Sequence, residues 1–191
     1  MKRILVAAVA ALGLGISFPA FAAVGVNAEG GVQGFTSDLG SALRPGPNWG
    51  ASADLQPNAP LGLELRYEGA SNQLFGTGNV FSGPRQARVV QNGGEALAKL
   101  SLAHNNKAIF EPFVGAGVGF SHFNLSNPVA GFNNDTVGEV PFAAGIALHP
   151  GGHFNIGLRG DYDVLFSNDF APEQYQTGQT FRGQLTLGGN F

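Results

Sequence analysis

The chain has 191 residues, of which only 12% are charged and none is cysteine, and its formal net charge is −3. Soluble domains usually carry about 25% charged residues, and small secreted domains usually need disulfides, so both classes are disfavoured. The acidic balance argues against a nucleic-acid partner. Beyond the N-terminal segment, no apolar run reaches the roughly 18 residues of a membrane helix. The composition therefore favours a chain in which apolar and polar residues alternate, so that one face of each segment is apolar.

The N-terminus has the pattern of a secretory signal peptide. Lys2 and Arg3 precede an apolar run over residues 4–16, and the segment from Pro19 ends in an Ala-x-Ala pattern at Ala22. This order of basic, apolar and small residues predicts a signal peptide over 1–22 and a mature domain over 23–191. The alternative is a membrane anchor, but the apolar run is short and a proline follows it.

Eight segments with period-two alternation follow, which is the signature of β-strands. They span residues 24–36, 48–56, 61–71, 94–103, 109–122, 137–149, 153–164 and 180–191. The clearest is 61–71, where Leu61, Leu63 and Leu65 alternate with charged residues. Such lengths match the ~9–11 residues that cross a bilayer in a tilted barrel strand, and bacterial barrels have even strand numbers. The predicted fold is all-β, an eight-stranded antiparallel up-and-down transmembrane β-barrel.

The connections between these strands alternate in length. The links at 57–60, 104–107 and 150–152 are short, whereas those at 37–47, 72–93, 122–136 and 165–179 are long. Membrane barrels combine short periplasmic turns with long outer loops, so this alternation supports the assignment. Residues 85–91 either extend the fourth strand or form a separate arm. The arm is favoured, because Asn92, Gly93 and Gly94 have the composition of a turn.

Outward-facing aromatic residues fall into two bands under this register, as in membrane barrels. The outer band contains Trp49, Tyr67, Phe120, Phe142, Tyr162 and Phe181, and the periplasmic band contains Phe110, Phe154 and Phe191.

Residues 24–191 resemble the eight-stranded barrel domain of the OmpA family and its OmpX-like relatives. The resemblance depends on the glycine-rich segment from Pro112 to Phe120 and on the last strand, which ends at Phe191. It implies that Leu185, Leu187 and Phe191 form the signal read by the barrel-assembly machinery. It also implies an outer-membrane location after export to the periplasm. The chain stops at the last strand, so the periplasmic cell-wall domain of that family is not implied.

The inward face of the predicted barrel is charged. Its members are Glu29, Asp54, Glu64, Arg66, Glu68, Lys99, Glu111, Glu139, Arg159, Asp161, Asp163 and Arg182. One hypothesis is an ion pathway through the lumen. The favoured interpretation is a paired charge network, because an eight-stranded interior is just wide enough for side chains and buried charges must be paired.

Two patterns suggest chemistry but lack the required spacing. Ser121 and His122, with Ser126 and Glu139 nearby, invite comparison with barrel enzymes that deacylate lipid A. Adjacent residues in a strand point to opposite faces, however, so this Ser–His pair cannot form a nucleophile and its base. The histidines His104, His149 and His153 flank turns without the three or four convergent ligands of a metal site. No cofactor and no metal are expected.

The long loops contain Phe75, Phe81, Phe132 and Phe170, which either bind a surface partner or pack over the barrel mouth.

The expected function is that of a non-enzymatic outer-membrane protein with a structural or surface-interaction role through its outer loops. Its expected partners are membrane lipid and the assembly machinery, and the sequence names no partner for the loops. The alternatives are a narrow solute channel and a lipid A-modifying enzyme.

Overall fold

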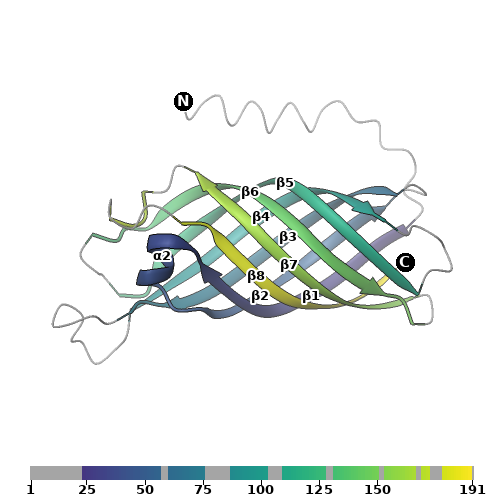
Figure 1. Ribbon diagram of the computed structural model, residues 1–191, viewed down its shortest axis with the longest axis horizontal. Coiled ribbons are helices and arrows are strands. Elements are labelled where there is room, and N and C mark those ends of the chain that lie inside the picture. The colour runs from purple at the N-terminus through teal and green to yellow at the C-terminus, as the bar shows by residue number, and fades with distance from the viewer. Residues whose placement is uncertain are drawn as a thin grey trace.

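The computed structural model describes residues 23–56, 60–75, 87–102, 109–127, 131–150, 153–166, 169–172 and 178–190. Eight antiparallel strands close into one barrel, in which each strand pairs with its neighbours in the sequence and β1 pairs with β8 (Figure 1). The strands are β1 (Ala23–Phe35), β2 (Gly46–Gln56), β3 (Leu61–Gln73), β4 (Arg88–Ser101), β5 (Phe110–Leu125), β6 (Asp135–Leu148), β7 (Phe154–Phe166) and β8 (Thr180–Asn190). The predicted fold is confirmed. The predicted signal peptide and Phe191 lie outside the described residues.

The two ends of the barrel differ in their connections. One end, called the α2 end here, contains the links 36–45, 74–87, 126–134 and 167–179 and the short helix α2 (Ser37–Ala42). The other end, called the turn end, contains the shorter links 57–60, 102–109 and 149–153. The predicted alternation of short and long connections is therefore confirmed. The helix was not predicted, because its residues were assigned to a loop.

The fourth strand begins earlier than predicted, so the predicted arm and turn are wrong. β4 starts at Arg88, and Asn92, Gly93 and Gly94 pair with β3 and β5 as ordinary strand residues. Gly93 faces Ser121 of the neighbouring strand, and a side chain at this position would lie only 2.6 Å from the Ser121 hydroxyl. The glycine thus serves close packing inside the barrel rather than a turn.

The β5–β6 ladder is interrupted near the middle of the barrel. The pairing passes from Ala116–Phe142 to Gly119–Glu139 without the two pairs between them. Pro141 lies in this gap, and proline has no N–H to donate to the neighbouring strand.

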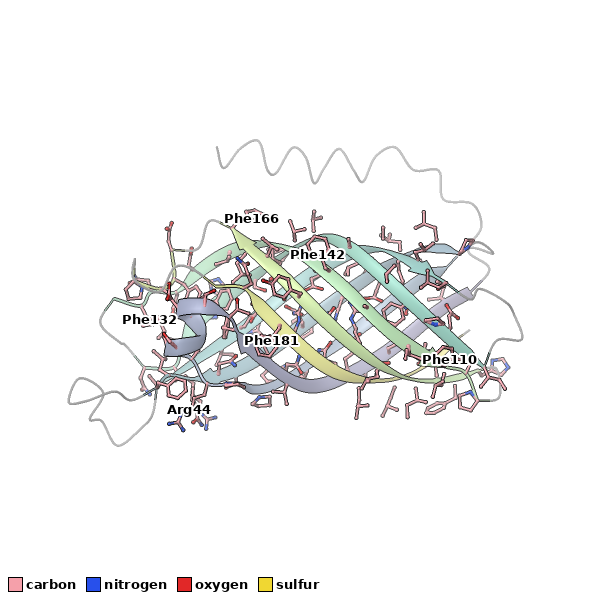
Figure 2. All side chains as sticks on the ribbon, viewed as in Figure 1. Arg44, Phe110, Phe132, Phe142, Phe166 and Phe181 are labelled. Atoms are coloured by element: carbon pink, nitrogen blue, oxygen red, sulfur yellow. The ribbon has the colours of Figure 1, made fainter. Side chains whose placement is uncertain are left out.

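The outer surface of the barrel wall is apolar. Large apolar side chains are exposed on every strand, among them Val26, Leu65, Val118, Phe142, Leu158 and Leu185. Figure 2 shows Phe110 at the turn end and Phe142 and Phe181 on the outside of the wall. A water-facing surface of this kind is rare on a monomer, whereas a lipid-facing surface requires it. No helix among the described residues is long and apolar enough to span a membrane.

Placing a cation on this wall tests its contact with lipid. Leu158 lies in the middle of β7 with 61% of its surface exposed, and we expect Leu158→Arg to lower the free energy of unfolding by about 2–4 kcal/mol. Urea titration of the protein refolded in lipid vesicles measures the change. Ile109 at the turn end is 68% exposed outside any strand, so Ile109→Arg is the control, with an expected change of at most about 1 kcal/mol. Equal changes for the two variants would place Leu158 outside the hydrocarbon.

Candidate functional site: the barrel interior and its mouth

The inward-facing side chains change from apolar to neutral polar to charged along the barrel axis, and strand β4 contributes to each of these layers. From the α2 end to the turn end, β4 points Val89, Gln91, Glu95 and Lys99 into the barrel. These four side chains belong, in the same order, to an apolar cluster, an amide layer, a central ion cluster and a lower ion cluster. The order follows from the strand rise of about 3.3 Å per residue, which separates inward positions four residues apart by about 13 Å.

Arg66 of β3 is the centre of the central ion cluster. Its Nε lies 2.7 Å from Glu29, and its Nη1 lies 3.1 Å from Asp161 and 3.3 Å from Glu95. Its second terminal nitrogen donates to the side-chain oxygen of Gln184. The guanidinium therefore connects β1, β4, β7 and β8 across the lumen. A planar group with five donors suits such a junction better than a lysine would.

Arg182 of β8 is the second cation of the central cluster. Its Nη2 lies 2.6 Å from Glu95 and 2.7 Å from Asp163, and it also pairs with Glu68. Both arginines thus share Glu95, which lies between them. Removing either cation would leave several buried carboxylates with fewer positive partners.

The lower ion cluster lies toward the turn end. Lys99 is 2.8 Å from Asp54 and 3.5 Å from Glu64, and Arg159 pairs with Glu64 and lies 2.8 Å from Asp161. Asp161 therefore joins the two ion clusters, because it contacts both Arg66 and Arg159. Phe113 adds an apolar surface here, with the Lys99 ammonium 4.5 Å from the ring centroid.

Above the ions, toward the α2 end, lies a layer of neutral polar side chains. Gln33 donates to Gln91 at 2.5 Å, and Gln91 donates to Ser121 at 2.8 Å. Asn72 donates to the backbone oxygens of Gln33 at 3.1 Å and of Arg44 at 3.0 Å. These side chains are buried, so their hydrogen bonds replace the water that they would otherwise require.

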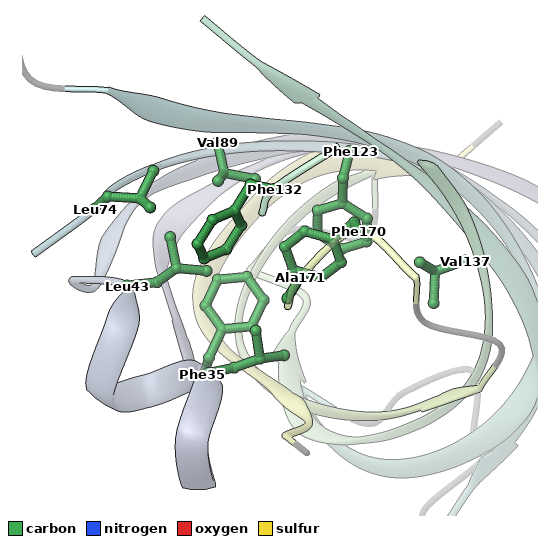
Figure 3. Close-up of a cluster of buried hydrophobic side chains, with 10 residues drawn as sticks. Phe35, Leu43, Leu74, Val89, Phe123, Phe132, Val137, Phe170 and Ala171 are labelled. Atoms are coloured by element: carbon green, nitrogen blue, oxygen red, sulfur yellow. The ribbon is translucent and has the colours of Figure 1, made fainter. Parts of the chain in front are cut away.

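An apolar cluster fills the mouth at the α2 end, and we call it the mouth cluster. It consists of Phe35, Leu39, Leu43, Leu74, Val89, Phe123, Phe132, Val137, Phe170 and Ala171. Phe170 is 0% exposed and stacks on Phe123 with ring centroids 4.4 Å apart and an interplanar angle of 6°. Figure 3 shows Phe123 and Phe170 inside the ring of strands, with Leu43 and Leu74 on the side of helix α2. The two loop aromatics Phe132 and Phe170 therefore pack into the mouth instead of pointing into solvent.

The structure brings together most of the inward charges predicted from the sequence. Glu29, Glu64, Arg66, Glu68, Lys99, Arg159, Asp161, Asp163 and Arg182 all take part in interior ion pairs. Glu139 is buried but accepts hydrogen bonds from the Ser121 hydroxyl at 3.0 and 3.2 Å. Glu111 is separate from the network: its nearest ionic contact is His149, at 3.9 Å, near the turn end.

Glu95 was missing from the predicted network, although it contacts both central arginines. Glu95 could have been predicted from the alternation of the fourth strand, because it lies four residues before Lys99 and therefore points to the same face. The polar residues Gln33, Asn72 and Gln91 were also missed. Asn72 and Gln91 were assigned to the long connection between the third and fourth strands, and Gln33 carries no charge.

Ser121 and His122 point to opposite faces, as predicted. Ser121 is 0% exposed in the interior, whereas His122 is exposed outside and its Nδ1 lies 2.9 Å from the Thr136 hydroxyl. The exposed Ser126 hydroxyl accepts from the backbone N–H of Arg88. This set of residues therefore does not provide a serine nucleophile with a histidine base.

Three buried carboxylates, Glu68, Glu95 and Glu139, have oxygen atoms within 4.8 Å of one another. Such a group suggests a cation site, but Arg182 pairs with both Glu68 and Glu95, and Arg66 lies 3.3 Å from Glu95. The two guanidinium groups already supply positive charge at this position.

Comparison with solved structures shows the fold. The chain is similar to the N-terminal β-barrel domain of Pseudomonas aeruginosa OprF, with 14% identity, a TM-score of 0.59, and coverage of 88% of this chain and 97% of that one. It is similar to Neisserial surface protein A, with 13% identity, a TM-score of 0.61, and coverage of 88% and 99%. No protein-family model and no curated protein sequence matches the chain.

A third similar structure is that of Ail, the attachment invasion locus protein of Yersinia pestis, solved in complex with the heparin analogue sucrose octasulfate. Its identity is 12%, its TM-score is 0.60, and the match covers 88% of this chain and 98% of that one. The chain therefore has the fold of small eight-stranded outer-membrane barrels.

Proposed function

We propose that this protein is a non-enzymatic integral outer-membrane protein whose interactions take place on its outer wall and at its α2 end. The observation that carries this proposal is the filled interior. Among the described residues, two ion clusters, an amide layer and the mouth cluster occupy the lumen in succession, so the interior groups are engaged with one another rather than with solutes or substrates. The remaining surfaces are an apolar wall suited to lipid and the connections at the α2 end.

The fold shared with outer-membrane barrels supports this location. Export by the predicted signal peptide and insertion by the barrel-assembly machinery through Leu185, Leu187 and Phe191 belong to the same proposal. The structure describes the first two of these residues, and both are exposed on the outside of β8. Gel migration of the outer-membrane fraction tests the location. We expect a band that shifts on boiling in detergent, and a soluble periplasmic protein without a shift would overturn the assignment.

Conductance across a planar lipid bilayer tests the filled interior. We expect no steady openings from the purified, refolded protein, because at least four layers of side chains close the lumen.

An enzymatic role is tested separately by the composition of lipid A after overexpression, which we expect to be unchanged. A new lipid A species would instead indicate an enzyme.

A narrow channel is the second candidate, and one observation predicts its selectivity. The described interior holds eight carboxyl groups, from Glu29, Asp54, Glu64, Glu68, Glu95, Glu139, Asp161 and Asp163, against four cations, from Arg66, Lys99, Arg159 and Arg182. If steady openings are observed, the excess of carboxylates predicts a current carried by cations. Reversal potentials in a salt gradient measure this preference, and an anion-selective current would contradict it.

A further inference from the structure

A row of hydrogen-bonding side chains crosses the outside of the barrel at the α2 end. The backbone N–H of Arg44 donates to the carbonyl of Gln73 at 2.8 Å, and Gln73 is paired with Arg88 in the β3–β4 ladder. The backbone N–H groups of Arg88 and Ser126 in turn donate to the Ser126 hydroxyl and the Arg88 carbonyl, each at 2.9 Å. Arg44, Gln73, Arg88 and Ser126 therefore occupy neighbouring positions on four adjacent segments, and we call them the outward row.

The side chains of the outward row continue the lipid-facing side of the wall. Arg44, Arg88 and Ser126 are exposed, and Gln73 shares the parity of the exposed Tyr67 on β3. Figure 2 shows Arg44 pointing away from the barrel at the α2 end. Arg88 lies four residues beyond Asn92 on β4, and Asn92 is bonded to Tyr67 of the aromatic band at 2.8 Å. The row thus lies just beyond the aromatic band, at the level where lipid headgroups meet a barrel.

The outward row carries two positive charges, from Arg44 and Arg88, and contains no carboxylate. In the described part of the chain neither Arg44 nor Arg88 forms an ion pair, in contrast to the four interior cations. The exposed carboxylates near this end, Asp38, Asp135 and Asp169, belong to α2, β6 and the following link rather than to the row. Arg44 is also held in place, because its guanidinium carbon lies 4.8 Å from the centre of the Phe75 ring.

Strand geometry sets the spacing of the two arginines. Adjacent strands lie about 4.8 Å apart, so two steps across Gln73 place the Arg44 and Arg88 backbones roughly 10 Å apart. With Arg44 held on the Phe75 ring, the long Arg88 side chain can reach across this gap, so that the two arginines contact one phosphate or two neighbouring phosphates. The amide of Gln73 between them and the hydroxyl of Ser126 beside them suit the hydroxyl groups of a sugar.

From this arrangement we propose that the outward row binds the phosphate-bearing headgroup of a phosphorylated glycolipid in the membrane leaflet at the α2 end. A lipid is favoured over a soluble polyanion because the row points sideways from the wall and is continuous with the apolar surface below it. The inference goes beyond the proposed function and is independent of whether the lumen conducts. It requires only that the wall lies in lipid.

The test measures binding of bis-phosphorylated lipid A to the refolded protein in zwitterionic detergent micelles. Trp49 is the only tryptophan in the chain and lies on the outside of β2, so its fluorescence is the readout. An arginine near an anionic lipid surface contributes roughly 5-fold to binding, so we expect Arg44→Gln with Arg88→Gln to weaken binding about 25-fold at low salt. The double variant Arg44→Lys with Arg88→Lys keeps the charge, and we expect it to retain most of the affinity.

Two comparisons separate the row from the overall charge. Ser37→Asp with Asn133→Asp makes the same change in net charge at exposed positions of the same end that lie outside the row, and we expect it to bind as the unchanged protein does. Lipid A without phosphates should bind weakly to all variants. Equal binding by the Gln double variant and the unchanged protein would overturn the proposal. Displacement of lipid A by a soluble sulfated polysaccharide at equal charge concentration would also overturn it, in favour of a site for soluble polyanions. A boiling-dependent gel shift for each variant confirms that it is folded.

Discussion

Replacing Arg66 with methionine is expected to lower the free energy of unfolding by about 3–5 kcal/mol, the cost of leaving buried charges without a partner. Arg66 lies within 3.3 Å of Glu29, Asp161 and Glu95, and its side chain is shielded from solvent. Methionine keeps the unbranched part of the side chain, but it lacks the guanidinium group and therefore every donor. Urea titration of the refolded protein in zwitterionic vesicles, followed by Trp49 fluorescence, measures the difference.

The control for this prediction is Arg88→Met, which removes the same charge from an exposed position of β4. We expect it to change the free energy of unfolding by no more than about 0.5 kcal/mol, as is usual for surface positions. If Arg66→Met behaves like the control, the interior charges are hydrated as they are on a surface. The further change Glu29→Gln should then have no coupling to Arg66, whereas in the described network a double-mutant cycle should give a clear interaction energy.

Replacing Phe170 with alanine is expected to destabilise the mouth cluster by about 3–5 kcal/mol, the usual cost of truncating a buried phenylalanine. Phe170 is fully buried, stacks on Phe123, and lies 6.3 Å from the Phe132 ring. Its carbonyl also accepts the backbone N–H of Asn133 at 2.9 Å, which connects two loops. Hydrogen exchange at the Asn133 amide should therefore accelerate in the variant, together with a lower free energy of unfolding.

Phe75 provides the matched control, because it is another loop phenylalanine at the α2 end but lies outside the mouth cluster. Phe75→Ala should leave the Asn133 amide as protected as it is in the unchanged protein. If the two variants have equal effects on exchange, the mouth cluster does not hold the loops together. Planar-bilayer recordings of Phe170→Ala extend the test: the ion clusters below the mouth cluster should keep the lumen closed.

The strands could be predicted from the sequence wherever they lie in lipid. There an apolar outside and a polar inside give period-two alternation, as in Leu61, Leu63 and Leu65 of β3, which face outward. The same alternation placed the charges of the central and lower ion clusters inside the barrel, because a charge on the other face would contact hydrocarbon. What alternation cannot give is the pairing of these charges, which depends on the register between strands far apart in the sequence.

The prediction failed at the α2 end. Residues 88–93 form strand, although the successive residues Gln91 and Asn92 point to opposite faces and are both polar. The sequence there has no alternation of polar and apolar residues that would indicate a strand. Helix α2 has little local propensity, since it contains Gly40 and begins at Ser37 with a positive φ of 52°. Burial of Leu39 and Leu43 in the mouth cluster stabilises it instead. Such contacts with distant strands leave no periodic signal in a six-residue segment.

The mouth cluster also marks a reversal in the side-chain pattern of the wall. Through most of the barrel the polar residues point inward, but at the α2 end Phe123 and Val137 point inward while the neighbouring His122 and Thr136 point outward. In this portion the barrel has an apolar core and a polar outer surface, as a small water-soluble barrel does. The switch takes two residues, from Ser121 to Phe123 along β5 and from Glu139 to Val137 along β6, so the sequence of these two strands marks the height at which the barrel wall leaves the hydrocarbon.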